Sequence, residues 1–207
     1  HNVMISGAGG TGKTWLIKSI YTHALETEKC IRVCALTGCA SLLLNCKATT
    51  IHSWAGIGIH MNGTIDTIVR KCMRNTGAKK QFCKIDILVI DEVSMMSCRI
   101  FDLLNKIGKK IKTNDKPFGG IQVIFSGDFL QLPPVKENVF CFESNDFNNT
   151  FNKIINLTKI YRQNDKIFRK LLSNIRVGLI SKSNIDLLNS KVQKDDYKKI
   201  DITRLVP

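Results

Sequence analysis

The stretch "NVMISGAGGTGKT" (2–14) decides the fold of this chain of 207 residues. Residues 2–6 form a short apolar run typical of a buried strand, and a helical pattern follows from about Thr14 to Glu26. Between them, "GAGGTGKT" (7–14) matches G-x-x-x-x-G-K-[ST] in full, in the order strand, turn, helix that the pattern requires. We therefore predict a P-loop after the first strand of an α/β domain, and we disfavour a fortuitous glycine-rich turn.

The residue types in this turn suit a nucleoside triphosphate and Mg²⁺. Glycines let the backbone fold so that its N–H groups point at phosphate oxygens, and the helix that follows adds its positive N-terminal end. Lys13 is placed to reach the β- and γ-phosphates, and the Thr14 hydroxyl is a ligand for Mg²⁺. We expect ATP or GTP to contact the whole turn, which consists of Gly7, Ala8, Gly9, Gly10, Thr11, Gly12, Lys13 and Thr14.

A second motif supplies the acids that a nucleoside triphosphatase needs at the end of another core strand. In "ILVIDEVSMM" (87–96), four apolar residues are followed by Asp91 and Glu92. Asp91 is placed to hold Mg²⁺ through water, and Glu92 is placed to orient and deprotonate the attacking water. An acidic pair often marks only the start of a helix, where the helix dipole favours it. Because this pair follows a buried strand downstream of a P-loop, we predict hydrolysis.

The rest of the chain alternates short apolar runs with helical patterns, which is typical of a parallel sheet covered by helices on both faces. Strands are expected at 31–36, 85–90, 121–126 and 154–157, and helices from about Gly38, at 64–74 and at 100–111. Further on, we expect Asp165 and Ser183 to cap two more helices and Gly178 to end the first of them. The predicted fold class is α/β, of the doubly wound kind.

Composition bounds the class of protein and its environment. Apolar residues make up 43% of the chain, and no apolar run approaches the ~18 residues of a membrane span, so we expect a globular protein with no membrane partner. The eight cysteines include no C-x-x-C pair, and the four histidines do not stand beside them at ligand spacing. We therefore expect reduced thiols in an intracellular compartment, and not disulfides or zinc. Nucleus, mitochondrion and viral replication site are not distinguished.

The charge balance points to polyanionic partners. The chain carries 31 Lys and Arg against 17 Asp and Glu, a formal net charge of +14. A positive field of this size favours nucleic acid. A solvated, lysine-rich surface explains the same number, so charge alone leaves both interpretations open.

Five segments together resemble one family. These segments are "GAGGTGKT" (7–14), "ALTGCASLLLNCKATTIHSWAGIG" (35–58), "LVIDEVSMM" (88–96), "GGIQVIFSGDFLQLPPV" (119–135) and "LTKIYRQND" (157–165). Their order and spacing resemble those of the Pif-type (petite integration frequency) DNA helicases of superfamily 1B. The resemblance covers residues 3 to about 178, and "GDFLQLPPV" and "TIHSWAGIG" are far more specific to it than the P-loop. Members of this family are ATP-driven motors that move 5′ to 3′ along single-stranded DNA, with ATP between two RecA-like domains. RecD is a more distant relative.

The resemblance implies roles for further residues around the triphosphate. Gln131 would sense the γ-phosphate or the attacking water, kept in place by Pro133 and Pro134, and Asp128 would lie near Mg²⁺. Arg162 would be an arginine finger on the transition-state charge, although a surface salt bridge at a helix start is the simpler alternative. The predicted catalytic residues are Lys13, Glu92, Gln131 and Arg162, and the predicted metal residues are Thr14 and Asp91.

The resemblance also implies a path for single-stranded DNA. Hydroxyls, backbone amides and an imidazole can hold phosphates without reading sequence, and the residues implied are Thr37, Gly38, Thr50, His52 and Ser53. Family members usually have a paired small residue and a Gly-Gly at positions where this chain has Ser41, Cys46 and Lys47. This departure concerns the DNA residues and not the P-loop.

Two nearby features can be explained either by DNA binding or by an ordinary structural role. Trp54 could stack on a base, which is worth ~1–3 kcal/mol, but beside an apolar helix we favour a core position. A basic strip would attract nucleic acid or would be only a solvated face, and it consists of Arg70, Lys71, Arg74, Lys79 and Lys80.

The resemblance predicts the organisation of the chain and its function. We expect residues 1–178 to form the first RecA-like ATPase domain of a helicase, and 179–207 to form a helical and polar connection to the start of a second one, at "ITRLVP" (202–207). A chain that starts on His1 without Met is expected to be a piece of a longer protein. Alone, it should bind nucleotide weakly, hydrolyse it slowly and not unwind DNA.

The expected partners are single-stranded DNA and DNA duplex junctions, and we expect a monomer. Two alternatives to the Pif-type motor stay open at this point. One is a RecD-like or relaxase-linked helicase subunit, which shares the same motor. The other, from a different class, is a nucleotide-gated module that binds single-stranded nucleic acid without moving along it.

Overall fold

The computed structural model of the protein describes residues 1–58, 63–135 and 137–190. The chain divides into two compact units, His1–Arg162 and Gln163–Pro207, and each is described by itself. The expected domain boundary at 178 falls inside the second unit, and that domain assignment stays a prediction. The expected start of a further domain, at 202–207, lies outside the described residues.

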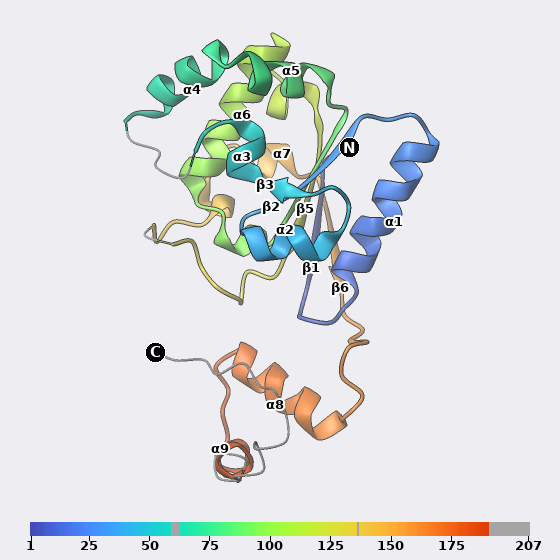
Figure 1. The fold of residues 1–207 in the computed structure, drawn as a ribbon. Coiled ribbons are helices and arrows are strands. Elements are labelled where there is room, and N and C mark those ends of the chain that lie inside the picture. Colours follow the sequence, from blue (N-terminus) through green and yellow to red (C-terminus); the bar gives the residue numbers. More distant parts are fainter. Residues whose placement is uncertain (59–62, 136, 191–207) are drawn as a thin grey trace, which may run out of the picture. The chain divides into compact units, whose positions relative to one another are not determined.

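A single parallel sheet of six strands forms the centre of the first unit (Figure 1), in the order β3–β2–β4–β5–β1–β6. The strands are β1 (Val3–Gly7), β2 (Ile31–Ala35), β3 (Thr49–Thr50), β4 (Ile87–Asp91), β5 (Gln122–Gly127) and β6 (Lys153–Leu157). Every neighbouring pair runs parallel. The predicted α/β fold with a parallel sheet is therefore confirmed, and the carboxyl ends of all the strands meet at one edge.

Helices cover both faces of this sheet (Figure 1). They are α1 (Lys13–Glu26), α2 (Gly38–Leu44), α3 (Ile51–Ala55), α4 (Ile65–Arg74), α5 (Thr76–Lys84), α6 (Cys98–Lys112) and α7 (Phe147–Thr150), with short 3-10 turns at Val93–Met95, Pro117–Gly120 and Cys141–Glu143. The second unit contains α8 (Lys166–Arg176) and α9 (Lys182–Asn189). None of the described helices is long and apolar enough to cross a membrane.

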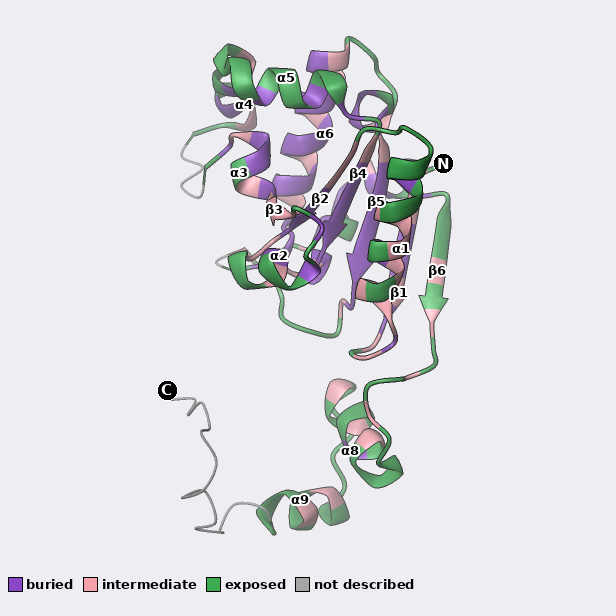
Figure 2. Cartoon of the chain, turned by 45° about the vertical axis from the view of Figure 1, so that its right-hand side comes forward, coloured by how far each residue is buried: buried purple, intermediate pink, exposed green. Residues whose placement is uncertain are grey.

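Each central strand contributes to two cores, because successive side chains of a strand point to opposite faces. On β4, Leu88 and Ile90 pack into the larger core with α3 to α7, whereas Val89 packs into the smaller core with Ile17 of α1. The inner strands are accordingly buried, while β6 at the edge is largely exposed (Figure 2). Trp54 is 3% exposed and lies in the larger core, 4.5 Å from the ring of Phe82, so the prediction of a core position is confirmed.

The segment between β3 and β4 is more helical than its sequence suggested. The expected basic helix is α4, but a second helix, α5, follows it at once. Asn75 causes the break, because its backbone is extended and its side chain accepts a hydrogen bond from the Ala78 amide, which caps α5. Ile85 then ends α5, so β4 begins at Ile87 and not at the expected residue 85.

Of the two helix caps expected in the second unit, one is confirmed and one is wrong. Asp165 accepts hydrogen bonds from the amides of Ile167 and Phe168 and caps α8, and Gly178 follows this helix with a left-handed φ of 73°. The prediction that Ser183 caps the last helix is wrong. Ser181 is the cap, because its hydroxyl is the one that accepts from the Asn184 amide, and Ser183 lies inside α9.

All eight cysteines are free thiols. Burial raises the pKa of Cys34 and of Cys141 to about 12, so both stay protonated and pack as small apolar side chains. Among the described residues, no cluster of three or more His, Cys, Asp or Glu side chains could hold a metal ion.

Candidate functional site

The predicted catalytic residues follow four strands that are neighbours in the sheet. The P-loop follows β1, Asp91 ends β4, the Gln131 loop follows β5, and Arg162 follows β6. Because β4, β5, β1 and β6 are consecutive in the sheet order, their carboxyl ends lie side by side. Ligands of open parallel sheets bind at this kind of edge.

One cavity of about 380 Å³ contains the whole set. Its walls are Gly9, Gly10, Gly12, Lys13, Thr14, Trp15, Asp91, Glu92, Gln131, Tyr161 and Arg162. These include every residue predicted to be catalytic and both residues predicted to hold a metal. The structure thus brings together groups that lie far apart in the sequence, from residue 13 to residue 162.

The P-loop has the backbone shape that its glycines allow. Gly10 and Gly12 adopt left-handed conformations, with φ of 82° and 93°, and the Thr11 hydroxyl donates a hydrogen bond to the Ala8 carbonyl. The Lys13 ammonium donates to the carbonyl oxygens of Gly7, at 2.7 Å, and Ala8, at 3.1 Å. Lys13 is therefore held over the loop to which a phosphate chain would bind.

Arg162 is fixed to the P-loop through its backbone. The amides of Tyr161 and Arg162 lie 2.8 and 3.3 Å from the carbonyl oxygen of Gly10, to which they donate. The fit is close enough that a Cβ added to Gly10 would lie 2.7 Å from the Cβ of Arg162. No ion pair of the described residues involves Arg162, so the alternative of a surface salt bridge is not supported.

Asp91 is a buried acid with an unused acceptor. It is 5% exposed, and burial raises its pKa while Ser126 and Lys13 oppose part of that shift. Its Oδ1 has no hydrogen-bond partner among the described residues, and the nearby Ser126 hydroxyl makes no bond of normal geometry. A buried carboxylate oxygen without a partner, in the same cavity as the Thr14 hydroxyl, fits the oxygen ligands that Mg²⁺ requires.

Glu92 has a strained backbone. Its φ of 57° and ψ of 41° are left-handed, a conformation that costs of order 1 kcal/mol for a residue with a side chain and that recurs at functional sites. Burial raises its pKa, the charge of Asp91 raises it further, and Lys13 opposes both. Together with its place in the cavity, this is the environment of a carboxylate that accepts a proton.

The loop after β5 holds Gln131 at the cavity. The Gln131 amide donates to the Asp128 carbonyl at 2.9 Å, and its Nε2 donates to the Asp128 carboxylate at 3.4 Å. Asp128 is 1% exposed and supports Gln131 from behind the cavity wall, and its charge acts on Lys13 and Glu92. Pro134 is buried and anchors the far end of the loop.

The predicted DNA residues lie at the other end of the same sheet edge. Thr37 follows β2 and caps α2 by accepting from the Ala40 amide, and Thr50 ends β3 and caps α3 by accepting from the Ser53 amide. Each hydroxyl still has a proton to donate. Burial lowers the pKa of His52, so its imidazole is neutral at neutral pH. Gly38, the first residue of α2, has no atom within 4 Å of an added Cβ, so a ligand can approach its backbone.

Sequence reasoning missed two residues of the cavity wall, Trp15 and Tyr161. Their only signal is position, because Trp15 directly follows the P-loop threonine and Tyr161 directly precedes Arg162. No general motif gives either aromatic residue a role.

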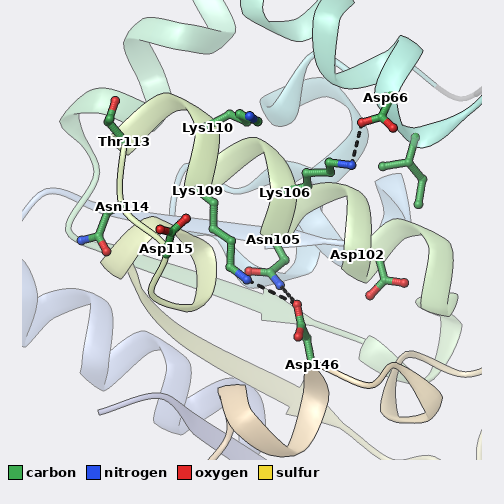
Figure 3. Close-up of a pocket in the computed structure, with 11 residues that line it drawn as sticks. Asp66, Asp102, Asn105, Lys106, Lys109, Lys110, Thr113, Asn114, Asp115 and Asp146 are labelled. Atoms are coloured by element: carbon green, nitrogen blue, oxygen red, sulfur yellow. Dashed lines mark hydrogen bonds and ion pairs between the residues drawn. The ribbon is translucent and has the colours of Figure 1, made fainter.

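A larger polar cavity, of about 730 Å³, borders α4 and α6 (Figure 3) and contains none of the predicted site residues. Its charges are largely paired: Lys106 with Asp66 at 2.6 Å, and Lys109 with Asp146 at 3.4 Å. The buried Asn105 donates to Asp146 and accepts from the Phe118 amide. These contacts brace α6 against its neighbours, which is a structural role.

Comparison with known proteins identifies the family. The family model described as "PIF1-like helicase" matches residues 1–186. The chain is 39% identical over 185 residues to ATP-dependent DNA helicase RRM3 of Saccharomyces cerevisiae, covering 86% of this chain and 25% of that protein. It is 38% identical over 214 residues to the uncharacterized protein 030L of Invertebrate iridescent virus 6, covering 96% of this chain and 40% of that protein.

Solved structures agree with the sequence comparison. The Pif1 helicase from Candida albicans superposes with a TM-score of 0.87 at 34% identity, covering 96% of this chain and 45% of that chain. The Pif1 helicase from Bacteroides in complex with ADP-AlF3 and single-stranded DNA gives 0.77 at 30% identity, covering 97% and 48%. The chain thus spans less than half of the length of these relatives. Over nearly all of its own length, it belongs to the PIF1-like helicase family.

Proposed function

We propose that this chain is the ATP-hydrolysing motor domain of a 5′ to 3′ DNA helicase, which couples hydrolysis to movement along single-stranded DNA. The observation that carries the proposal is the single cavity in which Lys13, Thr14, Asp91, Glu92, Gln131 and Arg162 meet. A P-loop alone would suggest only phosphate binding. The acid, the amide and the arginine around it are the parts that hydrolysis requires.

The proposed mechanism assigns one task to each side chain. Lys13 and the backbone amides of the P-loop bind the β- and γ-phosphates of ATP, which charge and the helix N-terminus favour. Thr14 and Asp91 hold Mg²⁺, which when bound neutralises charge that develops on the phosphate oxygens. Both tasks position the substrate and involve no proton transfer.

The remaining residues act on the attacking water and on the transition state. Glu92 accepts the proton of the water as it attacks the γ-phosphate, helped by the raised pKa of its carboxyl. Gln131 orients that water, and its own position is fixed by Asp128. Arg162 stabilises charge on the transferring group, a contribution of about 10³- to 10⁵-fold where it has been measured in other phosphoryl-transfer proteins.

For the DNA side, we propose that Thr37, Gly38, Thr50, His52 and Ser53 hold the phosphates of a single strand. Support comes from the caps that fix the Thr37 and Thr50 hydroxyls at the starts of α2 and α3, and from the Bacteroides relative solved with single-stranded DNA. Duplex junctions are proposed as a further partner, because a related structure describes two coordinating Pif1 helicases at forked DNA. A monomeric chain in a reducing compartment is also part of the proposal, the compartment being supported by eight free thiols.

Steady-state hydrolysis, measured with and without single-stranded DNA, tests the proposal. The chain should hydrolyse ATP slowly, faster with DNA, and should not separate strands alone. Lys13→Ala should abolish hydrolysis, whereas Glu92→Gln should lower it by about 10²- to 10⁴-fold and leave ATP binding intact. Normal hydrolysis by Glu92→Gln would show that the base is another group. Tight DNA binding with an unchanged rate would instead favour a nucleotide-gated binding module, which the helicase relatives do not favour.

A further inference from the structure

The end of β5 carries a buried hydroxyl that the mechanism above does not use. Ser126 is 0% exposed, and the three residues before it on the strand, 123–125, are all apolar. Its Oγ makes no hydrogen bond of normal geometry with any described residue. Because a buried hydroxyl without a partner is costly, such a group in a folded chain calls for a specific reason.

The register of the sheet places Ser126 beside Asp91. The pairing of β4 with β5 sets Ile90 against Phe125, so Asp91 and Ser126 are the next residues on the two neighbouring strands. Oδ1 of Asp91 likewise has no hydrogen-bond partner in the described part of the chain. Burial raises the pKa of Asp91, and the Ser126 hydroxyl opposes that rise more than any other group does. A donor and an acceptor that both lack partners therefore lie within reach of each other.

The two side chains point to the same face of the sheet, the face that α1 covers. Successive residues of a strand point to opposite faces, so residues two apart share a face. Val89, two residues before Asp91, and Ile124, two residues before Ser126, both pack into the smaller core with Ile17 of α1. The hydroxyl and the carboxylate thus face the helix whose first turn belongs to the P-loop.

The next residue on β5 fixes the backbone around this pair. A Cβ added to Gly127 would lie 2.9 Å from Cγ2 of Val93 and 3.0 Å from the Val93 amide nitrogen. The end of β5 therefore packs closely against the backbone that directly follows Asp91 and Glu92. This contact does not involve the Ser126 hydroxyl, which leaves the hydroxyl to act on the carboxylate itself.

We propose that Ser126 is a positioning residue for Asp91: its hydroxyl donates to one carboxylate oxygen and sets the orientation in which the carboxylate holds Mg²⁺. The inference rests on the proposed role of Asp91 in holding Mg²⁺. Because Ser126 is fully buried, it acts through Asp91 and does not touch the nucleotide. Outer partners that orient the residues around a metal typically contribute about 10- to 100-fold in metal affinity.

Calorimetric titration of the full chain with the ATP analogue AMPPNP, in Mg²⁺ and in EDTA, measures the factor by which the metal tightens binding. Ser126→Ala should lower this factor by about tenfold or more and should leave the affinity in EDTA unchanged. Asp91→Asn should lower the factor as well. In the Asp91→Asn chain, Ser126→Ala should cause no further loss, because a residue that acts only through the Asp91 carboxylate has nothing left to position.

Ser94→Ala is the matched control. Ser94 is 1% exposed, and its hydroxyl also lacks a partner among the residues that the structure describes. It is not among the groups that act on the pKa of Asp91 or of Glu92. The variant removes an equivalent hydroxyl from the adjoining 3-10 turn, and it should bind AMPPNP like the wild type in both conditions.

The outcomes separate this inference from the proposed function. If Mg²⁺ does not tighten AMPPNP binding to the wild-type chain, or if Asp91→Asn binds like the wild type, the proposed metal role of Asp91 is wrong and the inference falls with it. If Asp91→Asn loses the effect of Mg²⁺ but Ser126→Ala, folded by circular dichroism, keeps it, only the role of Ser126 is wrong. Equal losses in Ser126→Ala and Ser94→Ala, or a further loss in the double variant, would also refute that role.

Discussion

Gly10 is the residue at which the P-loop contacts the segment that carries Arg162. Its φ of 82° is left-handed, and an added Cβ would lie 2.7 Å from the Cβ of Arg162. We predict that Gly10→Ala costs about 1–2 kcal/mol through backbone strain and also displaces Arg162, so that hydrolysis falls by up to about a thousandfold. ATP turnover and ADP affinity, measured together, check this prediction, and turnover should fall more.

The matched control is Gly178→Ala. Gly178 has a similar φ of 73°, but an added Cβ meets no atom within 4 Å. This variant should lose stability by the same route and keep its turnover. Equal losses of turnover and of ADP affinity in Gly10→Ala would mean that the alanine disturbs only phosphate binding, and that Arg162 does not depend on this contact.

Glu92 should trade stability for activity. Because burial raises its pKa in the folded chain, the ionised carboxylate is destabilising at neutral pH, and this cost disappears as pH falls through the raised pKa towards the ordinary value of 4.5. We predict that Glu92→Gln raises the melting temperature near neutral pH, and that the gain shrinks near pH 4.5. In the wild type, hydrolysis should fall with decreasing pH while an ordinary glutamate would still be ionised. Thermal unfolding and a pH–rate profile check both parts.

Glu28→Gln is the control for this prediction, because Glu28 also has a left-handed φ, of 54°, but is exposed. It should leave the melting temperature nearly unchanged at every pH. A melting temperature that stays the same or falls in Glu92→Gln at neutral pH would mean that the buried carboxylate is not a source of instability.

At the level of single residues, sequence predicts chemistry where a motif fixes both residue type and spacing. Lys13 and Asp91 follow from the P-loop and from the strand that ends in an acid, and both line the cavity. Gln131 and Arg162 could be chosen only through a family resemblance, since an amide or an arginine in a loop has no general meaning. The place of Trp15 in a cavity wall could not be predicted, because Leu157 and Tyr161 complete that wall from the far end of the chain.

Among the elements, α2 and α3 are two short helices whose caps coincide with proposed DNA contacts. We predict that Thr50→Val costs about 1 kcal/mol of stability by removing the cap and weakens single-stranded DNA binding by about tenfold or more, because in the proposed path the hydroxyl also donates to a phosphate. Thr64→Val is the matched control, since Thr64 caps α4 in the same way, by accepting from the Thr67 amide. Chemical denaturation and fluorescence anisotropy with a labelled oligonucleotide measure the two effects. Equal DNA affinities of the two variants would remove Thr50 from the path.

Strands and long helices were more predictable than the short elements. The strand at 121–126 differs from β5 (Gln122–Gly127) by one residue at each end, because a continuous apolar run signals a strand buried on both faces. By contrast, α5 has only two buried residues, Ala78 and Phe82, and its sequence gives little apolar periodicity. The two-residue β3 exists only because Thr49 and Thr50 pair with β2, a tertiary contact that local sequence does not encode.

Across the whole sheet, strand order separates two tasks. The strands β4, β5, β1 and β6 carry the proposed ATP residues, and the adjacent pair β3 and β2 carries the proposed DNA residues. Asp91 on β4 pairs in register with Ala35 on β2. The acid that is proposed to hold Mg²⁺ therefore lies one strand away from the segment that leads to Thr37. A shift of the β4 end with the state of the nucleotide would therefore reach the DNA residues through directly hydrogen-bonded strands.

The last prediction concerns the net charge of +14. This charge can attract single-stranded DNA as a diffuse field, or through contacts of particular lysines with particular phosphates. The basic strip lies exposed on α4 and α5, and α5 packs against α3, which carries His52 and Ser53. We predict that Lys79→Gln with Lys80→Gln lowers the slope of log affinity for single-stranded DNA against log salt by about 1.4, or ~0.7 for each phosphate that a lysine no longer neutralises. Hydrolysis without DNA should not change.

Lys166→Gln with Lys170→Gln on α8 removes the same charge from the second unit and should leave the slope intact. Equal changes in the two double variants would show a diffuse field, and no change in either would reduce the strip to a solvated face.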